Sequence, residues 1–166
     1  MKKILCFIAE LFDERELFYP VIRMKEAGYQ VDIAGPEKKE YSGKVGMKLQ
    51  ADLAFDDVKA EDYEGLLIPG GYAPDKIRTN KAALELVRAF DEAQKPIGMI
   101  CHAGWVGASA GILKGRKMTS TAAIKDDLIH AGAEWVNEGP VVDKNLVTAR
   151  NPDDLAESAK AFLELL

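Results

Sequence analysis

The chain has 166 residues, of which 48% are hydrophobic and 30% charged, an ordinary balance for a globular protein with one sizeable core. Its formal net charge of −5 argues against nucleic acid as the main partner. No apolar run approaches the ~20 residues that span a bilayer, so we expect no membrane association and a single domain over residues 1–166.

The N-terminal segment indicates a cytoplasmic protein. Only six apolar residues precede Glu10, so the segment is more typical of a first strand than of a secretion signal. The chain has two cysteines, Cys6 and Cys101, which we therefore expect to be free thiols in a reducing compartment. The cysteines and the two histidines lack the spacing of zinc ligands, so no metal site is expected.

Apolar runs of strand length alternate with helical periodicity along the chain. In chain order we predict a strand at 4–8, a helix at 16–26, a strand at 31–34, a short strand or hairpin within 41–52, a strand at 65–68, a helix at 81–93, a strand at 97–100, helices at 102–112 and 124–131, strands at 140–143 and 146–149, and a helix at 152–165. On the first helix, Leu17, Val21, Met24 and Lys25 share the inward spacing. The alternation predicts an α/β fold, with a mostly parallel sheet and helices on both faces.

Three segments with reactive side chains follow predicted strands, namely 10–16, 69–75 and 101–102. In open parallel sheets, sites lie at the carboxyl ends of the strands. Cys101 stands where a strand turns sharply into a helix, and the backbone N–H groups there favour a thiolate. The alternative is a small buried thiol, the common fate of cysteine and the one we expect for Cys6. The adjacent His102 makes the reactive role the stronger interpretation.

Several motifs occur in an order that resembles the PfpI branch of the ThiJ/PfpI superfamily. They are Pro69-Gly70-Gly71-x-Ala73-Pro74-Asp75, Ile100-Cys101-His102, Gly111-x-Leu113-x-Gly115-Arg116-Lys117, Ile124-Lys125-Asp126-Asp127 and Arg150-x-Pro152-x-Asp154-Leu155, and they span most of the chain. The resemblance implies a flavodoxin-like three-layer sandwich, a homo-oligomer (dimer or hexamer) and a cysteine hydrolase centre without a cofactor. Members are described as intracellular proteases, glyoxalases or deglycases that repair methylglyoxal-modified groups.

The resemblance also implies roles for individual residues. Cys101 would be the nucleophile and His102 its partner. Glu16, in its Glu-Leu-x-Tyr-Pro context, matches the acid that touches the thiol, and Asp75 matches the acid that a neighbouring subunit supplies. The N–H groups of Gly71 and His102 would hold an oxyanion, which two adjacent glycines favour by letting the backbone approach a substrate.

Gly70, Trp105 and Thr121 are candidate substrate-pocket residues. The chain has Ala-Gly-Trp105 after Cys101-His102 where PfpI-like proteins usually have Gly-Pro, and Thr121 where they often have tyrosine. We expect the pocket shape and substrate choice to differ accordingly. Trp105 lines the pocket or packs in the core, and the sequence leaves both open.

Glu16 also has a structural interpretation, because Asp13 and Glu16 have the spacing of a capping box. A protonated Glu16 donates a hydrogen bond to a thiolate, whereas an ionised one repels it. Our hypothesis is that Glu16 is largely protonated when Cys101 is ionised. Asp75 stands near a short helix start, where an acid is favoured electrostatically. Arg150 either pairs with an acid near the site or caps the terminal segment.

The leading functional interpretation is a cofactor-free cysteine hydrolase or lyase that acts on small reactive carbonyls or on their protein or nucleotide adducts. One alternative is an intracellular cysteine peptidase. Another is a non-enzymatic redox sensor or chaperone-like stress protein, which would use the same thiolate. A glutamine amidotransferase is disfavoured, because such enzymes usually carry a late His-x-Glu element that this chain lacks.

Overall fold

In the computed structural model, which describes residues 1–166, the predicted strands form the core of a seven-stranded sheet. In spatial order its strands are β10 (Val141–Asp143), β11 (Leu146–Ala149), β7 (Ile97–Ile100), β6 (Gly65–Ile68), β1 (Lys3–Phe7), β2 (Gln30–Gly35) and β5 (Leu53–Ala54). All neighbouring strands are parallel except β10 and β11. The five central strands follow the order of flavodoxin-like sheets, so the predicted fold is confirmed.

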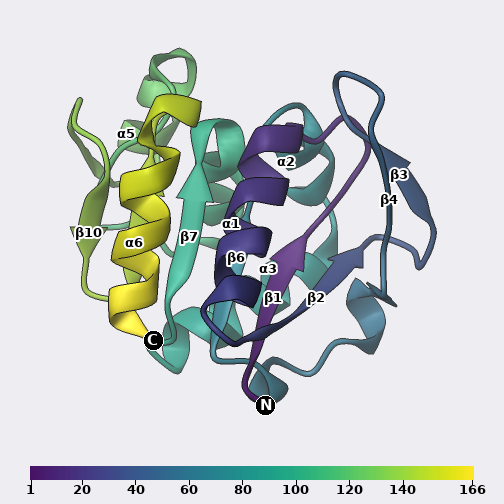
Figure 1. Ribbon diagram of the computed structural model, residues 1–166. Coiled ribbons are helices and arrows are strands. Elements are labelled where there is room, and N and C mark those ends of the chain that lie inside the picture. The colour runs from purple at the N-terminus through teal and green to yellow at the C-terminus, as the bar shows by residue number, and fades with distance from the viewer.

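Helices cover both faces of the sheet (Figure 1). Helix α1 (Glu14–Glu26) lies beside α6 (Leu155–Leu165) on one face, and α3 (Lys81–Glu92) and α4 (Gly104–Ala110) cover the other. A sheet covered on both faces buries every side chain of its central strands, which explains their continuous apolar runs. Phe162 on α6 and Phe90 on α3 are fully buried, one against each face.

Helix α1 begins two residues earlier than predicted, at Glu14. The carboxylate of Asp13 caps it by accepting hydrogen bonds from the N–H groups of Arg15 at 3.0 Å and Glu16 at 3.2 Å. The expectation for Lys25 was wrong, because this side chain is exposed. A residue at the margin of the helical stripe is free to turn its charged end to water.

The segment 41–52 is a hairpin, as one of the two sequence alternatives proposed. Strands β3 (Glu40–Ser42) and β4 (Lys48–Gln50) pair antiparallel, apart from the main sheet. Shorter elements escaped prediction because they contain too few residues to show a period. They are β5, α2 (Ala73–Ile77) and the parallel pair β8 (Lys117–Met118) and β9 (Glu134–Trp135). The short helix predicted at 124–131 is confirmed as α5 (Lys125–His130).

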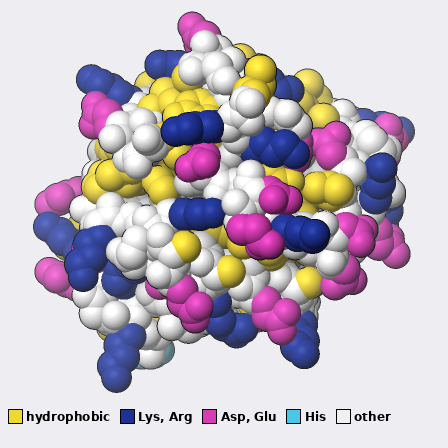
Figure 2. All heavy atoms as spheres, turned by 90° about the horizontal axis from the view of Figure 1, so that it is seen from below, with side chains coloured by type: hydrophobic (Ala, Val, Ile, Leu, Met, Phe, Trp, Pro, Cys, Tyr) yellow, Lys and Arg dark blue, Asp and Glu magenta, His cyan; other side chains and the backbone are white.

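The two ends of the sheet differ in character. The end where β1 begins carries positive and negative side chains interspersed with small apolar spots, and neither sign of charge dominates it (Figure 2). The opposite end, where the parallel strands terminate, carries the three segments with reactive side chains, 10–16, 69–75 and 101–102. No helix combines the length and apolar character that crossing a bilayer requires.

Candidate active site

Cys101 lies at the end of β7, in a turn that the chain makes only under strain. Its φ angle is 60°, in the left-handed region that residues other than glycine rarely adopt. A 3-10 turn over Cys101–Ala103 follows at once and leads into α4. Strained nucleophile elbows have this strand–turn–helix shape, and they hold a reactive side chain above the sheet edge.

His102 and Cys101 face one another. The Cys101 Sγ lies 3.3 Å from His102 Nδ1, within reach for proton transfer. Burial, followed by the positive charge of Lys44, lowers the pKa of His102 below its ordinary value. The imidazole is therefore neutral at neutral pH, so it acts as a proton acceptor and does not offer the thiolate a standing positive charge.

The backbone N–H groups of the turn do not by themselves ionise the Cys101 thiol. Burial raises the pKa of Cys101 to about 11, and the negative charge of Glu16 is the second cause. The N–H of His102, which bonds to the sulfur, acts in the opposite direction but is outweighed. The thiol is thus mostly protonated in the resting chain, and its proton must be removed as a substrate is attacked.

Glu16 is buried near Cys101, with 3% of its surface exposed. Its Oε1 accepts a hydrogen bond from the Gly70 N–H at 3.0 Å, across 54 residues of sequence. Burial, followed by the charge of Asp13, raises the pKa of Glu16 to about 7. The capping-box alternative fails for Glu16, since Asp13 alone caps the helix and the Asp13 N–H bonds instead to the Gly70 carbonyl.

Gly70 and Gly71, between β6 and α2, have different environments. Gly71 has a φ of 82° and lines the cleft over the site, and its N–H makes no backbone hydrogen bond. That N–H therefore remains available to a substrate oxygen. Gly70 is buried, and a Cβ placed on it would lie 2.9 Å from the Cys101 Cβ and press on the Glu16 carboxyl.

We expect Gly70→Ala to cost the protein at least about tenfold in activity while leaving it folded. The added methyl would push Glu16 and Cys101 apart, and small misplacements of reacting groups carry large kinetic penalties, up to ~10²-fold. Turnover and circular dichroism check this. Gly46→Ala is the matched control: Gly46 lies in the hairpin turn with a positive φ but with no atom within 4 Å of an added Cβ. Full activity in Gly70→Ala would contradict the assignment.

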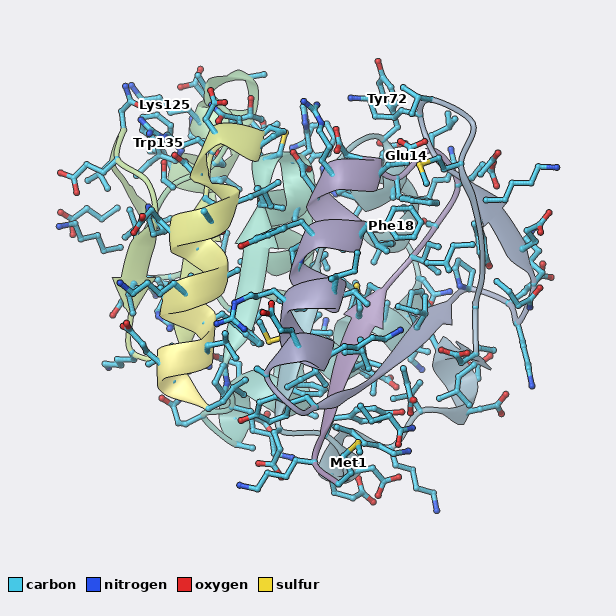
Figure 3. All side chains as sticks on the ribbon, viewed as in Figure 1. Met1, Glu14, Phe18, Tyr72, Lys125 and Trp135 are labelled. Carbon is cyan, nitrogen blue, oxygen red and sulfur yellow. The ribbon has the colours of Figure 1, made fainter.

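A cleft of about 310 Å³ opens beside His102, the neighbour of Cys101 in the chain. Its walls combine backbone, aromatic rings and one charge of each sign, from Leu11, Gly71, Tyr72, Asp75, Lys76, His102 and Trp105. Figure 3 shows Tyr72 at the end of the molecule where the parallel strands terminate, near Glu14 and the β3–β4 hairpin. The cleft admits a small molecule or a single side chain, which suits a substrate attacked at one carbon.

Trp105 lines this cleft and also packs against the main hydrophobic core, so both alternatives that the sequence left open apply. Its ring centroid lies 5.2 Å from that of His102, and the Arg78 guanidinium stands 5.2 Å from the indole. The indole N–H donates to Asp127 at 2.8 Å. Contacts with three side chains thus hold the indole in one position beside His102.

The other expected site residues fall in different places. Asp75 is exposed on the cleft wall and makes no hydrogen bond to His102 within the chain. Thr121 contacts the site through its backbone, whose N–H donates to the Cys101 carbonyl at 3.2 Å, and it does not line the cleft. Arg150 pairs with Asp154 at 2.9 Å, so it secures the start of the terminal helix and does not serve the site.

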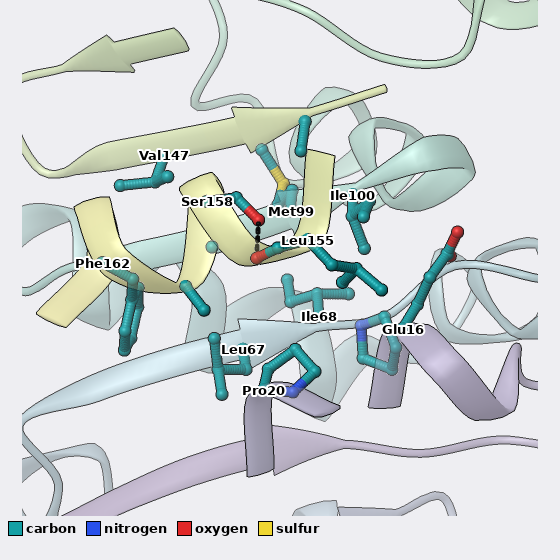
Figure 4. A pocket seen from close by; sticks show the side chains of 14 residues that line it. Glu16, Pro20, Leu67, Ile68, Met99, Ile100, Val147, Leu155, Ser158 and Phe162 are labelled. Atoms are coloured by element: carbon teal, nitrogen blue, oxygen red, sulfur yellow. Dashed lines mark hydrogen bonds between the residues drawn. The ribbon is translucent and has the colours of Figure 1, made fainter. Parts of the chain in front are cut away.

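Beneath the site lies a small, largely apolar pocket of about 30 Å³ between α1, α6 and the sheet (Figure 4). Glu16 stands at one end of it, and side chains such as Pro20, Ile68 and Leu155 line the rest. Few of the groups that line it are polar, so the Glu16 carboxyl has an apolar neighbour on this side. An apolar neighbour raises the free energy of the ionised carboxylate, in the same direction as the burial that raises the pKa of Glu16.

Sequence reasoning missed several residues that shape the site. Leu11, Tyr72 and Lys76 line the cleft and adjoin segments that the sequence did single out, so their position beside those motifs was a usable signal. Lys44 had no such signal. It comes from the β3–β4 turn and reaches Asp13 across 31 residues, with 3.4 Å between Nζ and Oδ2.

Comparison with known proteins shows the family of the chain. The family model of the DJ-1/PfpI family matches residues 2–165. The chain belongs to the DJ-1/PfpI family. It is 44% identical over 164 residues to the deglycase PfpI of Pyrococcus furiosus, with 99% of each chain covered. It is 41% identical to the putative cysteine protease YraA of Bacillus subtilis, covering 99% of this chain and 98% of that one.

Solved structures of the family share the fold. A two-domain protein of Anabaena variabilis with DJ-1/ThiJ/PfpI-like and ferritin-like domains superposes with a TM-score of 0.97 at 34% identity. The match covers 99% of this chain and 48% of that one. Drosophila melanogaster DJ-1beta gives a TM-score of 0.90 at 26% identity, covering 99% of this chain and 90% of that one. As a DJ-1/PfpI protein, the chain has the architecture that the motifs implied.

Proposed function

We propose that the protein is a cofactor-independent cysteine hydrolase of the deglycase type, which acts in the cytoplasm on reactive carbonyls and on their adducts with proteins or nucleotides. The observation that supports this best is the arrangement around Cys101. The Cys101 thiol lies on a strained turn, and the neutral imidazole of His102 is 3.3 Å from it. The buried Glu16 carboxyl accepts a hydrogen bond from the Gly70 N–H on the neighbouring loop. The full-length similarity to a protein named as a deglycase supports the same conclusion.

The proposed reaction begins with attack of the Cys101 sulfur on an electrophilic carbonyl carbon. The sulfur–carbon bond forms, the carbonyl electron pair moves to oxygen, and the thiol proton passes to His102 or Glu16. The resulting oxyanion is held by the Gly71 N–H, and by that of His102 once the sulfur no longer needs it. With methylglyoxal this intermediate is a hemithioacetal.

Product release completes the reaction without an oxidant or reductant. A proton moves from the hemithioacetal carbon to the neighbouring carbonyl carbon, so the hemithioacetal becomes a thioester. Water then cleaves the thioester, which releases lactate and restores the thiol. The net change is methylglyoxal plus water to lactate. A carboxyl with a pKa of about 7 exchanges protons readily at neutral pH, which fits Glu16 to the proton transfers.

Incubation with methylglyoxal-modified N-acetylcysteine, without added cofactor, tests the proposal. We expect lactate, and free N-acetylcysteine released faster than the adduct dissociates by itself. Lactate from methylglyoxal with no acceleration of thiol release would identify a glyoxalase instead of a deglycase. Absence of lactate from both substrates would overturn the proposal.

A peptidase is the second candidate, because the chain is also similar to a protein named as a putative cysteine protease. A cleft of about 310 Å³ suits one side chain better than an extended peptide. Fluorogenic peptides measured beside the carbonyl substrates distinguish the two functions. Peptide cleavage that is lost together with Cys101, with no lactate formed, would favour the peptidase.

We also propose that copies of the chain assemble. Asp75 is exposed and has no bond to His102 within one chain, which leaves the imidazole open to an acid from a neighbour. An open groove of about 730 Å³ runs along α1, where Phe18, Tyr19 and Ile22 lie. Arg15 and Asp153, which carry opposite charges, line the same groove, so a two-fold related copy pairs them reciprocally.

Ile22→Glu is expected to weaken this assembly at least about tenfold, since a charge would be buried at an apolar contact. Ile22 is 59% exposed in the single chain, so the substitution spares the fold. Sedimentation velocity checks the result over a range of concentrations. Ile129→Glu, at a position 42% exposed on α5, is the control. A sedimentation coefficient unchanged by Ile22→Glu would remove α1 from the interface.

A further inference from the structure

Asp127 lies in the first turn of α5 and contacts a wall of the cleft from outside. It is the last residue of the Ile124-Lys125-Asp126-Asp127 motif. Its Oδ2 accepts a hydrogen bond from the Trp105 indole N–H at 2.8 Å, across 22 residues of sequence. Asp126 is exposed in the same turn, but its side chain makes no hydrogen bond or ion pair. Of these two adjacent carboxylates, only Asp127 is therefore connected to the cleft.

The Trp105 indole in turn lies against the His102 imidazole. Residues three apart share one face of a helical turn, so Trp105 in α4 and His102 in the preceding 3-10 turn are neighbours. Their ring centroids are 5.2 Å apart, and the ring planes are tilted by 60°. Aromatic rings at this separation attract each other, so the position of the indole restrains that of the imidazole. Direct contacts thus connect Asp127 to His102.

Little else in the chain fixes the His102 ring. Its one hydrogen-bonding contact joins Nδ1 to the Cys101 Sγ at 3.3 Å. Once the sulfur bonds to a substrate carbon, this contact no longer restrains the ring. The Arg78 guanidinium lies over the indole, 5.2 Å from its centroid. A cation over a ring face does not fix how the ring is turned within its plane, whereas the directional N–H bond to Asp127 does.

We propose that Asp127 is a positioning residue, which fixes the His102 imidazole beside the nucleophile by holding the Trp105 indole. The inference rests on the proposed roles of Cys101 and His102 in the reaction. Asp127 does not line the cleft, so it acts through the indole and not on the substrate. The acidic end of the 124–127 motif thereby takes part in the reaction from the outer side of the cleft wall.

Removal of the Asp127 carboxylate should leave the fold intact. Helix α5 packs on α4 through the fully buried Leu128, and a Cβ placed on Gly104 would lie 2.9 Å from the Leu128 Cδ1. The buried Ile124 lies against the same glycine. The exposed Asp127 adds one hydrogen bond at the margin of this apolar contact. An effect of Asp127→Ala on the site therefore does not require α5 to unfold.

Proton NMR of the His102 ring measures its placement without a substrate. The chain has two histidines, so a His130→Gln background leaves a single set of ring signals. Near the indole these signals carry a ring-current shift, which depends on the distance and tilt between the two rings. Burial lowers the pKa of His102, so at about pH 8 the ring is neutral in every variant and a changed shift reports its position. We expect Asp127→Ala to move the signals, Asp127→Asn to restore them and Asp126→Ala to leave them unchanged.

Turnover of methylglyoxal measures the consequence for the reaction. We expect the kcat of Asp127→Ala to fall about three- to tenfold, because small misplacements of reacting groups carry large kinetic penalties. Asp127→Asn keeps an acceptor for the indole N–H and should restore kcat, and Asp126→Ala should leave it unchanged. Trp105→Phe keeps an aromatic ring but lacks the N–H. In that background, Asp127→Ala should therefore have no additional effect.

Unchanged ring signals or an unchanged kcat in Asp127→Ala would overturn the inference. Additive losses in the double variant would also overturn it, because Asp127 would then act by a route other than the indole. An equal loss in Asp126→Ala would attribute the effect to the charge of the α5 turn and would overturn it as well. An inactive wild type would instead overturn the proposed function, and the ring signals would still decide whether Asp127 positions His102.

Discussion

Cys101→Ala is expected to abolish turnover of methylglyoxal and its adducts, with a loss of at least about 10³-fold. Without the sulfur no covalent intermediate forms, and neither His102 nor Glu16 has a nucleophile to deprotonate. Lactate formation measures the loss, and alkylation should fall to the background of the buried thiol. Substantial turnover in this variant would exclude the covalent mechanism.

Cys6→Ala provides the matched control for Cys101→Ala. Cys6 lies within β1, 1% exposed, and burial raises the pKa of its thiol far above the ordinary range. Its removal should lower stability modestly and leave turnover unchanged. Together the two variants assign the reactivity of the protein to a single sulfur.

Two replacements of Glu16 should separate the effect of its charge from the effect of its hydrogen bond to Gly70. Glu16→Gln keeps an acceptor for the Gly70 N–H but removes the carboxylate, so the pKa of Cys101 should fall while proton transfer, typically ~10²–10⁴-fold in rate, is lost. Glu16→Leu also leaves the Gly70 N–H without a partner, so we expect a further loss. Unchanged titration and activity in Glu16→Gln would make the ionisation of Glu16 irrelevant.

The same residue predicts how stability depends on pH. The pKa of Glu16 is about 7 in the folded protein, above its ordinary value of 4.5, so the folded state keeps this proton to higher pH than the unfolded state does. Stability conferred by the protonated form is complete below about pH 4.5 and is lost as pH rises toward 7. Relative to Glu16→Gln, the wild type should lose about 3 kcal/mol over that interval. Urea titrations at several pH values measure the difference.

Much of the fold was predictable because its signals are local. Each central strand is a short apolar run, and the alternation with helices dictates a parallel sheet whose carboxyl ends share an edge. That edge brings Glu16, Gly70 and Cys101 together from three segments, as expected. The hydrogen bond between Glu16 and Gly70 could not be predicted, because it depends on how α1 packs against the loop after β6. Only the family resemblance indicated that Glu16 lies at the site.

Other features depend on contacts that no local pattern encodes. Lys44 contacts Asp13 from the turn of the β3–β4 hairpin. The buried Glu14 carboxylate holds that turn in place by accepting two of its backbone hydrogen bonds. The sequence indicates that backbone N–H groups favour a thiolate at Cys101, but the burial and the neighbouring carboxylate that outweigh them depend on the fold. The pairing of Arg150 with Asp154 was likewise one of two alternatives that only the fold could decide.

The left-handed backbone at Cys101 lowers the stability of the fold at the residue that we propose to be reactive. A side chain there costs of order 1–3 kcal/mol of conformational energy, which glycine would not incur. Glycine at position 101 would thus relieve this cost and stabilise the fold. Robust packing elsewhere, in the apolar layers on either side of the sheet, is what allows the chain to keep a costly residue at this corner.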